Sequence, residues 1–186
     1  MPTNVEIKAR IASVAALLPR VRGLAEQGPW EIRQDDTYFG CATGRLKLRV
    51  SSAAGGELIY YRRDNQNAPK ESFYLRSATS APDTLRVLLT QAYGEIGRIE
   101  KQRTLFLRGR TRIHLDKVRG LGEFLELEVV LAADEPSAVG ASEADELLKR
   151  LGVEPAQLIA GSYLDLLADS STPREPPAWA ESPVEN

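Results

Sequence analysis

The sequence predicts an α+β fold in which eight antiparallel strands close into a barrel, with a polar interior and helices packed outside. Hydrophobic and polar residues alternate with a period of two over most of the chain, which is typical of half-buried strands. Gly, Asn or Asp lies between most of these segments, as expected for antiparallel strands joined by turns. Three segments with a helical period interrupt the strands.

The alternation defines eight candidate strands. In the third, Arg45, Lys47 and Arg49 fall on one face and aliphatic residues fall on the other. In the first, Glu6 and Lys8 likewise share a face. The candidate strands span residues 5–10, 34–39, 45–51, 57–63, 70–75, 98–107, 110–116 and 123–131.

Apolar residues at helical spacing predict helices over residues 14–25, 81–93 and 143–151. Pro19 in the first predicts a kink or a late start. Ser80 and Asp83 resemble a capping box for the second helix, and Ser142 is the expected cap of the third.

The C-terminal stretch differs from the rest of the chain. Residues 169–186 are rich in Pro, Ser and Glu and carry no apolar period, so they cannot bury enough surface to offset the entropy of ordering. We therefore expect one domain over residues 1–168, followed by a disordered tail over 169–186.

Composition excludes several kinds of site. Cys41 is the single cysteine and His114 the single histidine, so an internal disulfide, a multi-cysteine metal site and a multi-histidine site are all excluded. No apolar run approaches the roughly 18 residues of a membrane span, and the N-terminus lacks a signal-peptide core. A net charge of −2 provides no global field for nucleic acid. We expect a cytoplasmic protein with no membrane or nucleic-acid partner.

The charged strand faces allow two arrangements. Apolar faces could fill the barrel and leave the charges in water, or the charges could line the interior. One strand face is entirely cationic, and another pairs Glu126 with Glu128, whereas a solvated face usually mixes signs. Three amphipathic helices also need an apolar surface, which the outer faces of the strands would supply. Both observations favour the polar interior.

A polar interior of this kind predicts a polyanion ligand. Arg binds phosphate oxygens in pairs, and Lys supplies a point charge. Mg²⁺ typically uses one or two carboxylates together with substrate phosphates, a role that Glu6, Glu126 and Glu128 fit. Without such ligands, we expect the inward cations to repel one another. No glycine-rich phosphate loop is present, so the implied chemistry at phosphorus would rely on these side chains.

Several motifs in order resemble the CYTH superfamily, whose members are also called triphosphate tunnel metalloenzymes. The order looks most like the class IV adenylate cyclase branch. The resemblance covers residues 4–167, and it departs at Asn4, where the family signature Glu-x-Glu-x-Lys has its first Glu. The motifs are VEIKAR at 5–10, DTYF at 36–39, GRLKLR at 44–49, LIYY at 58–61, EKQRTLF at 100–106, TRIHLD at 111–116 and GLGEFLELE at 120–128.

The resemblance implies an eight-stranded antiparallel tunnel that binds a triphosphate with Mg²⁺ or Mn²⁺. It implies that Glu6, Glu126 and Glu128 are metal ligands, with Asp116 as a further ligand or the orienter of one. Lys8 and Asp116 are the expected catalytic residues. The expected phosphate-binding residues are Lys8, Arg45, Lys47, Arg49, Arg63, Lys70, Lys101, Arg103 and Arg112.

Three functions remain open from the sequence. The first is cyclisation of ATP to cAMP and pyrophosphate. The second is hydrolysis of a triphosphate, whether inorganic triphosphate, thiamine triphosphate or a nucleoside triphosphate. The third is non-catalytic binding of a polyphosphate or nucleotide, against which the retained carboxylates argue. In each case the expected partner is a small triphosphate-containing molecule, and a homodimer is an open expectation.

Overall fold

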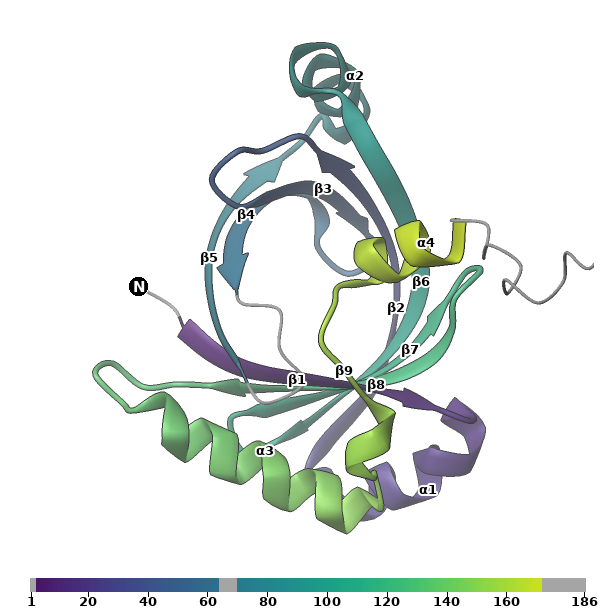
Figure 1. Cartoon of the computed structure of the whole chain (residues 1–186), viewed down its shortest axis with the longest axis vertical. Helices are drawn as coiled ribbons and strands as arrows, with labels where there is room; N and C mark the ends of the chain where they lie inside the picture. Colours follow the sequence, from purple (N-terminus) through teal and green to yellow (C-terminus); the bar gives the residue numbers. More distant parts are fainter. Residues whose placement is uncertain (1–2, 64–69, 172–186) are drawn as a thin grey trace, which may run out of the picture.

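The computed structural model describes residues 3–63 and 70–171, and its strands form a barrel seen end-on in Figure 1. The elements in chain order are β1 (Thr3–Ile11), α1 (Val14–Leu24), β2 (Gln27–Phe39), β3 (Arg45–Ser51), β4 (Gly55–Arg63), β5 (Lys70–Thr79), α2 (Pro82–Tyr93), β6 (Glu95–Arg108), β7 (Thr111–Val118), β8 (Gly122–Val130), α3 (Ser137–Leu151), a 3₁₀ turn (Pro155–Gln157), β9 (Leu158–Ile159) and α4 (Tyr163–Ser171).

Eight long strands close into an antiparallel barrel, which confirms the predicted fold class. The strand order is β5-β4-β3-β2-β6-β7-β8-β1, and an additional pairing between β1 and β5 joins the two ends. The short strand β9 pairs with β1 at Lys8 and Ala9, beyond the stretch that β5 occupies.

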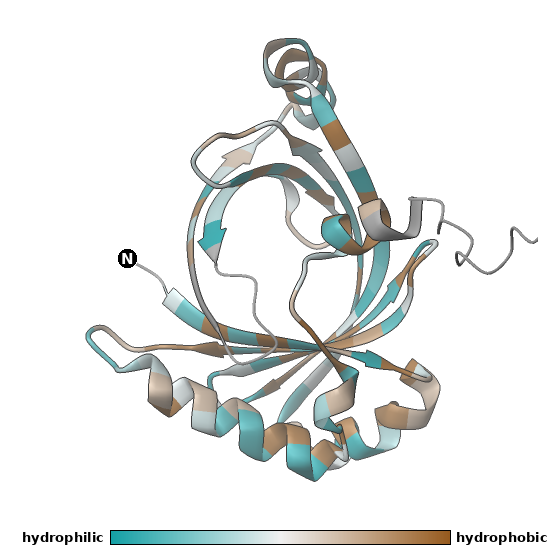
Figure 2. Cartoon of the chain, viewed as in Figure 1, coloured by the Kyte–Doolittle hydropathy of each residue, from teal (hydrophilic) through white to brown (hydrophobic). Residues whose placement is uncertain are grey.

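The largest apolar core lies between the barrel and the helices rather than inside the barrel. Along β1, Val5, Ile7 and Ala9 point outward and are buried against α1 and α3, whereas the intervening side chains point inward. Figure 2 shows this alternation of hydrophilic and hydrophobic residues along the strand. A smaller cluster, built on Phe39 and Leu48, packs beneath α2. The predicted polar interior is therefore correct.

Several strands are longer than the pattern predicts, and β2 exceeds its predicted length most. β2 begins at Gln27 rather than residue 34. The pattern missed its first part because Gly28-Pro29 interrupts the alternation and looks like a turn in the sequence. In the structure the β2–β6 ladder continues past this point with a register shift between Gln27 and Trp30.

The helix starts and caps also differ from the prediction in part. α1 begins at Val14, after its cap Ser13, and runs through Pro19, so it does not start late. α2 follows Ala81 without a side-chain cap, so the predicted Ser80 box is wrong. α3 begins at Ser137, which places the predicted cap Ser142 inside the helix. Proline marks both starts: Pro82 is the first residue of α2, and Pro136 immediately precedes the first residue of α3.

Helix α4 is not among the three helices predicted from the sequence. This helix reaches Ser171, three residues into the segment expected to be a tail, and the remaining tail residues 172–186 lie outside the described part of the chain. Leu164 of α4 packs where Gly97 of β6 has no side chain, which lets the helix approach the barrel closely. No helix within residues 3–63 and 70–171 is long and apolar enough to cross a membrane.

Candidate functional site

The barrel encloses a cavity of about 310 Å³ whose walls carry most of the predicted site residues. Tyr163, the first residue of α4, and Ser162 before it line one part of the cavity. The predicted residues that line it are Glu6, Lys8, Lys47, Arg49, Lys101, Arg103, Arg112, Glu126 and Glu128, together with His114.

Strand register brings these side chains together from distant parts of the sequence. Glu6 lies opposite Glu128 across the β1–β8 ladder, and Lys8 lies opposite Glu126. Because side chains on opposed residues of antiparallel strands share a face, one inward residue on each strand places its partner inward as well. The aliphatic outer faces fix this orientation, since a one-residue slip would expose them.

Glu126 lies among three positively charged or polarisable groups. It accepts a hydrogen bond of 2.7 Å from Arg103, and it lies 3.1 Å from the Lys8 ammonium and 3.3 Å from His114 Nδ1. Burial alone would raise the pKa of Glu126, but Lys8, His114 and Arg103 hold that pKa well below its ordinary value. The same surroundings lower the pKa of His114, through its burial and the charge of Arg103.

Glu128 is held on both oxygens. Its Oε1 accepts from the Asn4 amide at 2.5 Å, and its Oε2 accepts from Arg112 at 2.9 Å. Burial would raise the pKa of Glu128, yet the charges of His114 and Arg112 lower it. Asn4 stands where the family signature has its first Glu. It therefore holds the Glu128 carboxylate in position and does not supply a carboxylate of its own.

Behind the opposite wall, the buried Asp36 pairs with two of the predicted cations that line the cavity. It accepts from Arg49 at 2.7 and 2.6 Å and from Lys47 at 3.0 Å. These cations lower its pKa in spite of complete burial. Asp36 belongs to the DTYF motif at 36–39 and had no predicted role, although period-two alternation with the inward Tyr38 was a signal for it.

Asp116 lies behind the cavity wall rather than on it. Its fully buried carboxylate accepts two bonds of 2.6 Å from Arg103 and one of 2.8 Å from the Tyr163 hydroxyl, and Lys101 is 3.4 Å away. Asp116 therefore fixes the position of Arg103. The Tyr163 ring in turn lies 4.2 Å from the Lys8 ammonium.

The other three predicted phosphate-binding residues are Arg45, Arg63 and Lys70. Arg45 pairs with Asp165 of α4 at 2.9 Å and is absent from the cavity lining. The strand backbone at Arg63 and Lys70 is described, but the side chains of both residues lie outside the described part, so their predicted roles stay predictions.

The expected mutual repulsion of the cations is largely offset. Lys8, Lys47, Arg49, Lys101, Arg103 and Arg112 each have a carboxylate partner in the interior. Repulsion remains at the lysines: burial and the neighbouring Arg49 lower the pKa of Lys47 to about 8. Burial and Arg103 lower the pKa of Lys101 to about 7. The sequence showed the cations, but it could not show which carboxylates would meet them.

The residues present fit a divalent cation that also binds phosphate oxygens. Glu6, Glu126 and Glu128 supply the oxygen donors that a hard cation prefers, and Asn4 Oδ1 is buried with no hydrogen-bond partner in the described structure. Within the described residues, no three His, Cys, Asp or Glu side chains are arranged to hold a metal by themselves. A metal here would need ligands from a substrate.

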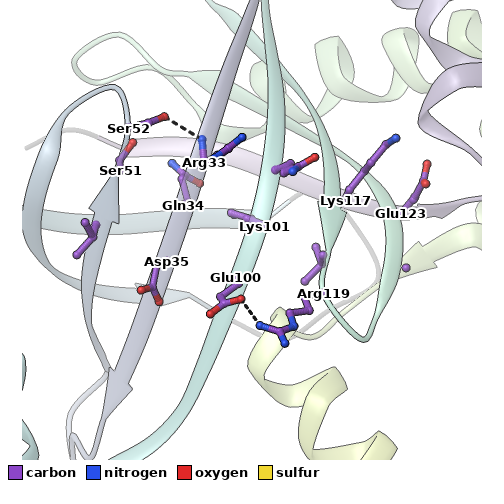
Figure 3. A pocket seen from close by; sticks show the side chains of 14 residues that line it. Arg33, Gln34, Asp35, Ser51, Ser52, Glu100, Lys101, Lys117, Arg119 and Glu123 are labelled. Atoms are coloured by element: carbon purple, nitrogen blue, oxygen red, sulfur yellow. Dashed lines mark hydrogen bonds and ion pairs between the residues drawn. The ribbon is translucent and has the colours of Figure 1, made fainter.

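A second hollow, of about 900 Å³, is lined by residues of β2, β3, β6, β7 and β8 and shares Gln34, Ser51 and Lys101 with the interior cavity (Figure 3). Arg33, Asp35 and Glu100 line it, and they alternate along β2 and β6 with the inward residues Gln34 and Lys101. Its charges are mixed in sign, and the Arg119–Glu100 pair there is exposed. Because exposed pairs contribute little and no single sign dominates, we favour the interior cavity as the site.

Comparisons with known proteins agree with this geometry. The family model of the CYTH domain matches residues 2–163. The adenylate cyclase CyaB of Aeromonas hydrophila is 27% identical over 177 residues, which cover 91% of each chain. The structure of the PH1012 protein from Pyrococcus horikoshii has a TM-score of 0.79 at 20% identity and covers 88% of this chain and 98% of that one.

A further structure is that of HpAC1 from Hippeastrum, a protein described as having a dominant triphosphatase activity. Its TM-score is 0.65 at 14% identity, and the match covers 92% of this chain and 97% of that one. At this identity the likeness concerns the fold alone. The family model, by contrast, spans nearly the whole described barrel. The chain belongs to the CYTH domain family.

Proposed function

We propose that this protein is a divalent-metal-dependent enzyme that acts on a triphosphate bound inside the barrel. The observation that carries the proposal is the convergence of Lys8, Lys47, Arg49, Arg103 and Arg112 on one cavity of about 310 Å³, with carboxylates on the same walls. Such a cavity suits a compact polyanion, because many fixed donors can contact its phosphate oxygens at once. The carboxylates distinguish it from a site that only binds anions.

The favoured reaction is cyclisation of ATP. The ribose 3′-oxygen would attack the α-phosphorus, the bond from that phosphorus to the bridging oxygen of the β-phosphate would break, and the hydroxyl proton would be released. The similarity to the adenylate cyclase CyaB over 91% of the chain supports this choice. A bound Mg²⁺ or Mn²⁺ would neutralise phosphate charge and lower the pKa of the attacking hydroxyl.

Residues of this chain would perform the remaining tasks. Arg103, held in place by Asp116, would bind phosphate oxygens with Nη1, which donates to no other side chain in the described structure. Lys47 and Lys101 would stabilise the departing pyrophosphate. Glu6, Glu126 and Glu128 would hold the metal, and Lys8 would orient the attacking oxygen.

The second candidate is triphosphate hydrolysis, in which water replaces the ribose hydroxyl as nucleophile. The fold likeness to HpAC1, described as having dominant triphosphatase activity, supports it. Both reactions use the same cations and carboxylates, so they differ mainly in whether the nucleophile comes from the substrate. We propose a cytoplasmic location for either activity.

Product analysis distinguishes these reactions. The protein is incubated with ATP, and separately with inorganic triphosphate, each with Mg²⁺ or Mn²⁺, and cAMP, pyrophosphate and orthophosphate are resolved. Equal amounts of cAMP and pyrophosphate from ATP support the cyclase, and orthophosphate from either substrate supports the triphosphatase. Arg119→Ala, which alters an exposed pair outside the cavity, is the matched control and should leave turnover unchanged. Tight binding without any product would contradict both.

A further inference from the structure

The carboxylates and cations of the interior neutralise one another. Glu126 contacts Lys8 and Arg103 at 3.1 and 2.7 Å, and Glu128 contacts Arg112 at 2.9 Å. The groups expected to hold a metal are therefore the partners of the groups expected to hold phosphate. Neither set can take up its ligand fully while these pairs persist.

The competition between the existing ion pairs and the expected ligands is clearest at Glu128. Both of its oxygens already accept hydrogen bonds, one from Asn4 and one from Arg112. A divalent cation that arrived alone would compete with Arg112 for Glu128, and it would leave the guanidinium without its partner. A triphosphate that arrived alone would attract Arg112 and leave the Glu128 carboxylate beside the buried Glu126. Unpaired charges in a half-buried site are unfavourable in either case.

We propose that triphosphate and divalent cation bind by an exchange of ion-pair partners centred on Arg112 and Glu128, so that each ligand strengthens the binding of the other. This inference rests on the proposed function. Arg112 turns from Glu128 to a phosphate oxygen, and Glu128 turns from Arg112 to the metal. No charge is left without a partner when both ligands are present, and one charge is left when either binds alone. The two binding equilibria are thus coupled, and the coupling is reciprocal.

Arg112 and Glu128 are the pair best suited to exchange. The Arg112 side chain is 38% exposed, whereas Arg103 is 7% exposed and is also bound by the fully buried Asp116. Arg103 would keep its position through Asp116 during binding. Within the described residues, Arg112 contacts the carboxylate of Glu128 and the hydroxyl of Tyr74, and a half-exposed arginine can move without opening the core.

The test measures each ligand alone, which avoids the chelation of metal by triphosphate in solution. Binding of Mn²⁺ alone is followed by the electron paramagnetic resonance of the free ion. Binding of inorganic triphosphate alone is followed by calorimetry with EDTA present. Arg112→Ala should bind Mn²⁺ at least about tenfold more tightly than the natural protein, because Glu128 has lost its competing partner. Glu128→Gln should bind metal-free triphosphate at least about tenfold more tightly, because Arg112 is released.

A charge-matched control separates exchange from a general loss of positive charge. Lys47→Ala removes the same charge from the same cavity, but Lys47 pairs with Asp36 rather than Glu128. Its effect on Mn²⁺ binding should be several times smaller than that of Arg112→Ala. Arg112→Gln serves as the second variant if Arg112→Ala does not fold.

The outcomes distinguish this inference from the proposed function. If the natural protein turns over ATP or inorganic triphosphate but the Arg112 variants bind Mn²⁺ no more tightly than Lys47→Ala, the exchange is wrong and the proposed function stands. If the natural protein turns over neither substrate and does not bind inorganic triphosphate together with Mn²⁺, both proposals are wrong.

Discussion

Triphosphate binding at pH 8 should draw protons onto two buried lysines. Burial and nearby arginines lower the pKa of Lys101 to about 7 and that of Lys47 to about 8. At pH 8, Lys101 is therefore about one-tenth protonated and Lys47 about half protonated in the unbound protein. An adjacent phosphate favours the charged form of both, so binding should take up about 0.9 proton at Lys101 and about 0.5 at Lys47.

The assay is calorimetry of inorganic triphosphate with Mg²⁺ in buffers of different ionisation enthalpy. The ligand can itself exchange protons, so the informative quantity is the difference between the natural protein and Lys101→Met. That variant should take up about 0.9 proton fewer at pH 8 and nearly the same number at pH 6, where Lys101 is already charged. Equal uptake by both proteins at pH 8 would refute the assigned burial of Lys101 beside a phosphate site.

The remaining predictions concern turnover, local stability and ligand response. Glu126→Gln and Glu128→Gln should each lower turnover by orders of magnitude while circular dichroism stays native, because a neutral amide is a poorer ligand for Mg²⁺; near-native activity at limiting Mg²⁺ would contradict the metal assignment. Tyr163→Phe removes the 2.8 Å bond to Asp116 and should lower the free energy of unfolding by about 1–3 kcal/mol in urea titrations, and no change would mean that this bond contributes nothing. Lys47→Ala should reduce the rise in Tm on adding triphosphate and leave the unbound Tm equal or higher, whereas a Tm rise equal to that of the natural protein would exclude it from the site.

The pKa of Lys101 also sets a stability trend. Its folded pKa lies below its unfolded value of 10.5, so the unfolded chain binds the proton more tightly. Stability from this group therefore increases as pH rises from about 7 towards 10.5, and the full penalty of burying the charge is present below about pH 7. Lys101→Met should accordingly raise the unbound Tm more at pH 6 than at pH 9.

Local patterns were enough to predict the barrel and its orientation. In β3, three cations alternate with aliphatic residues, so one face had to be buried and the other polar whatever the strand paired with. The same reasoning placed Glu126 and Glu128 together on β8. The resemblance to a family then assigned roles that alternation alone left open.

The parts that were missed depend on contacts between distant segments. The bond from Tyr163 to Asp116 spans 47 positions, and nothing near Tyr163 in the sequence indicates that α4 meets the barrel. Asp36 was visible as an inward residue, but its pairing with Arg49 follows from the β2–β3 register. The helix starts were misplaced because Ser is a common cap, while here Pro begins α2 and precedes α3.

The central claim is that the barrel interior binds a triphosphate together with a divalent cation. A thermal-unfolding titration with inorganic triphosphate and Mg²⁺ tests it most directly, because a ligand that binds only the folded state stabilises it by RT ln(1 + [L]/Kd). We expect a rise in Tm that grows with concentration and corresponds to about 2.7 kcal/mol at a hundredfold excess over Kd. A Tm that stays constant across the titration would contradict the account and return the interior charges to a purely structural role.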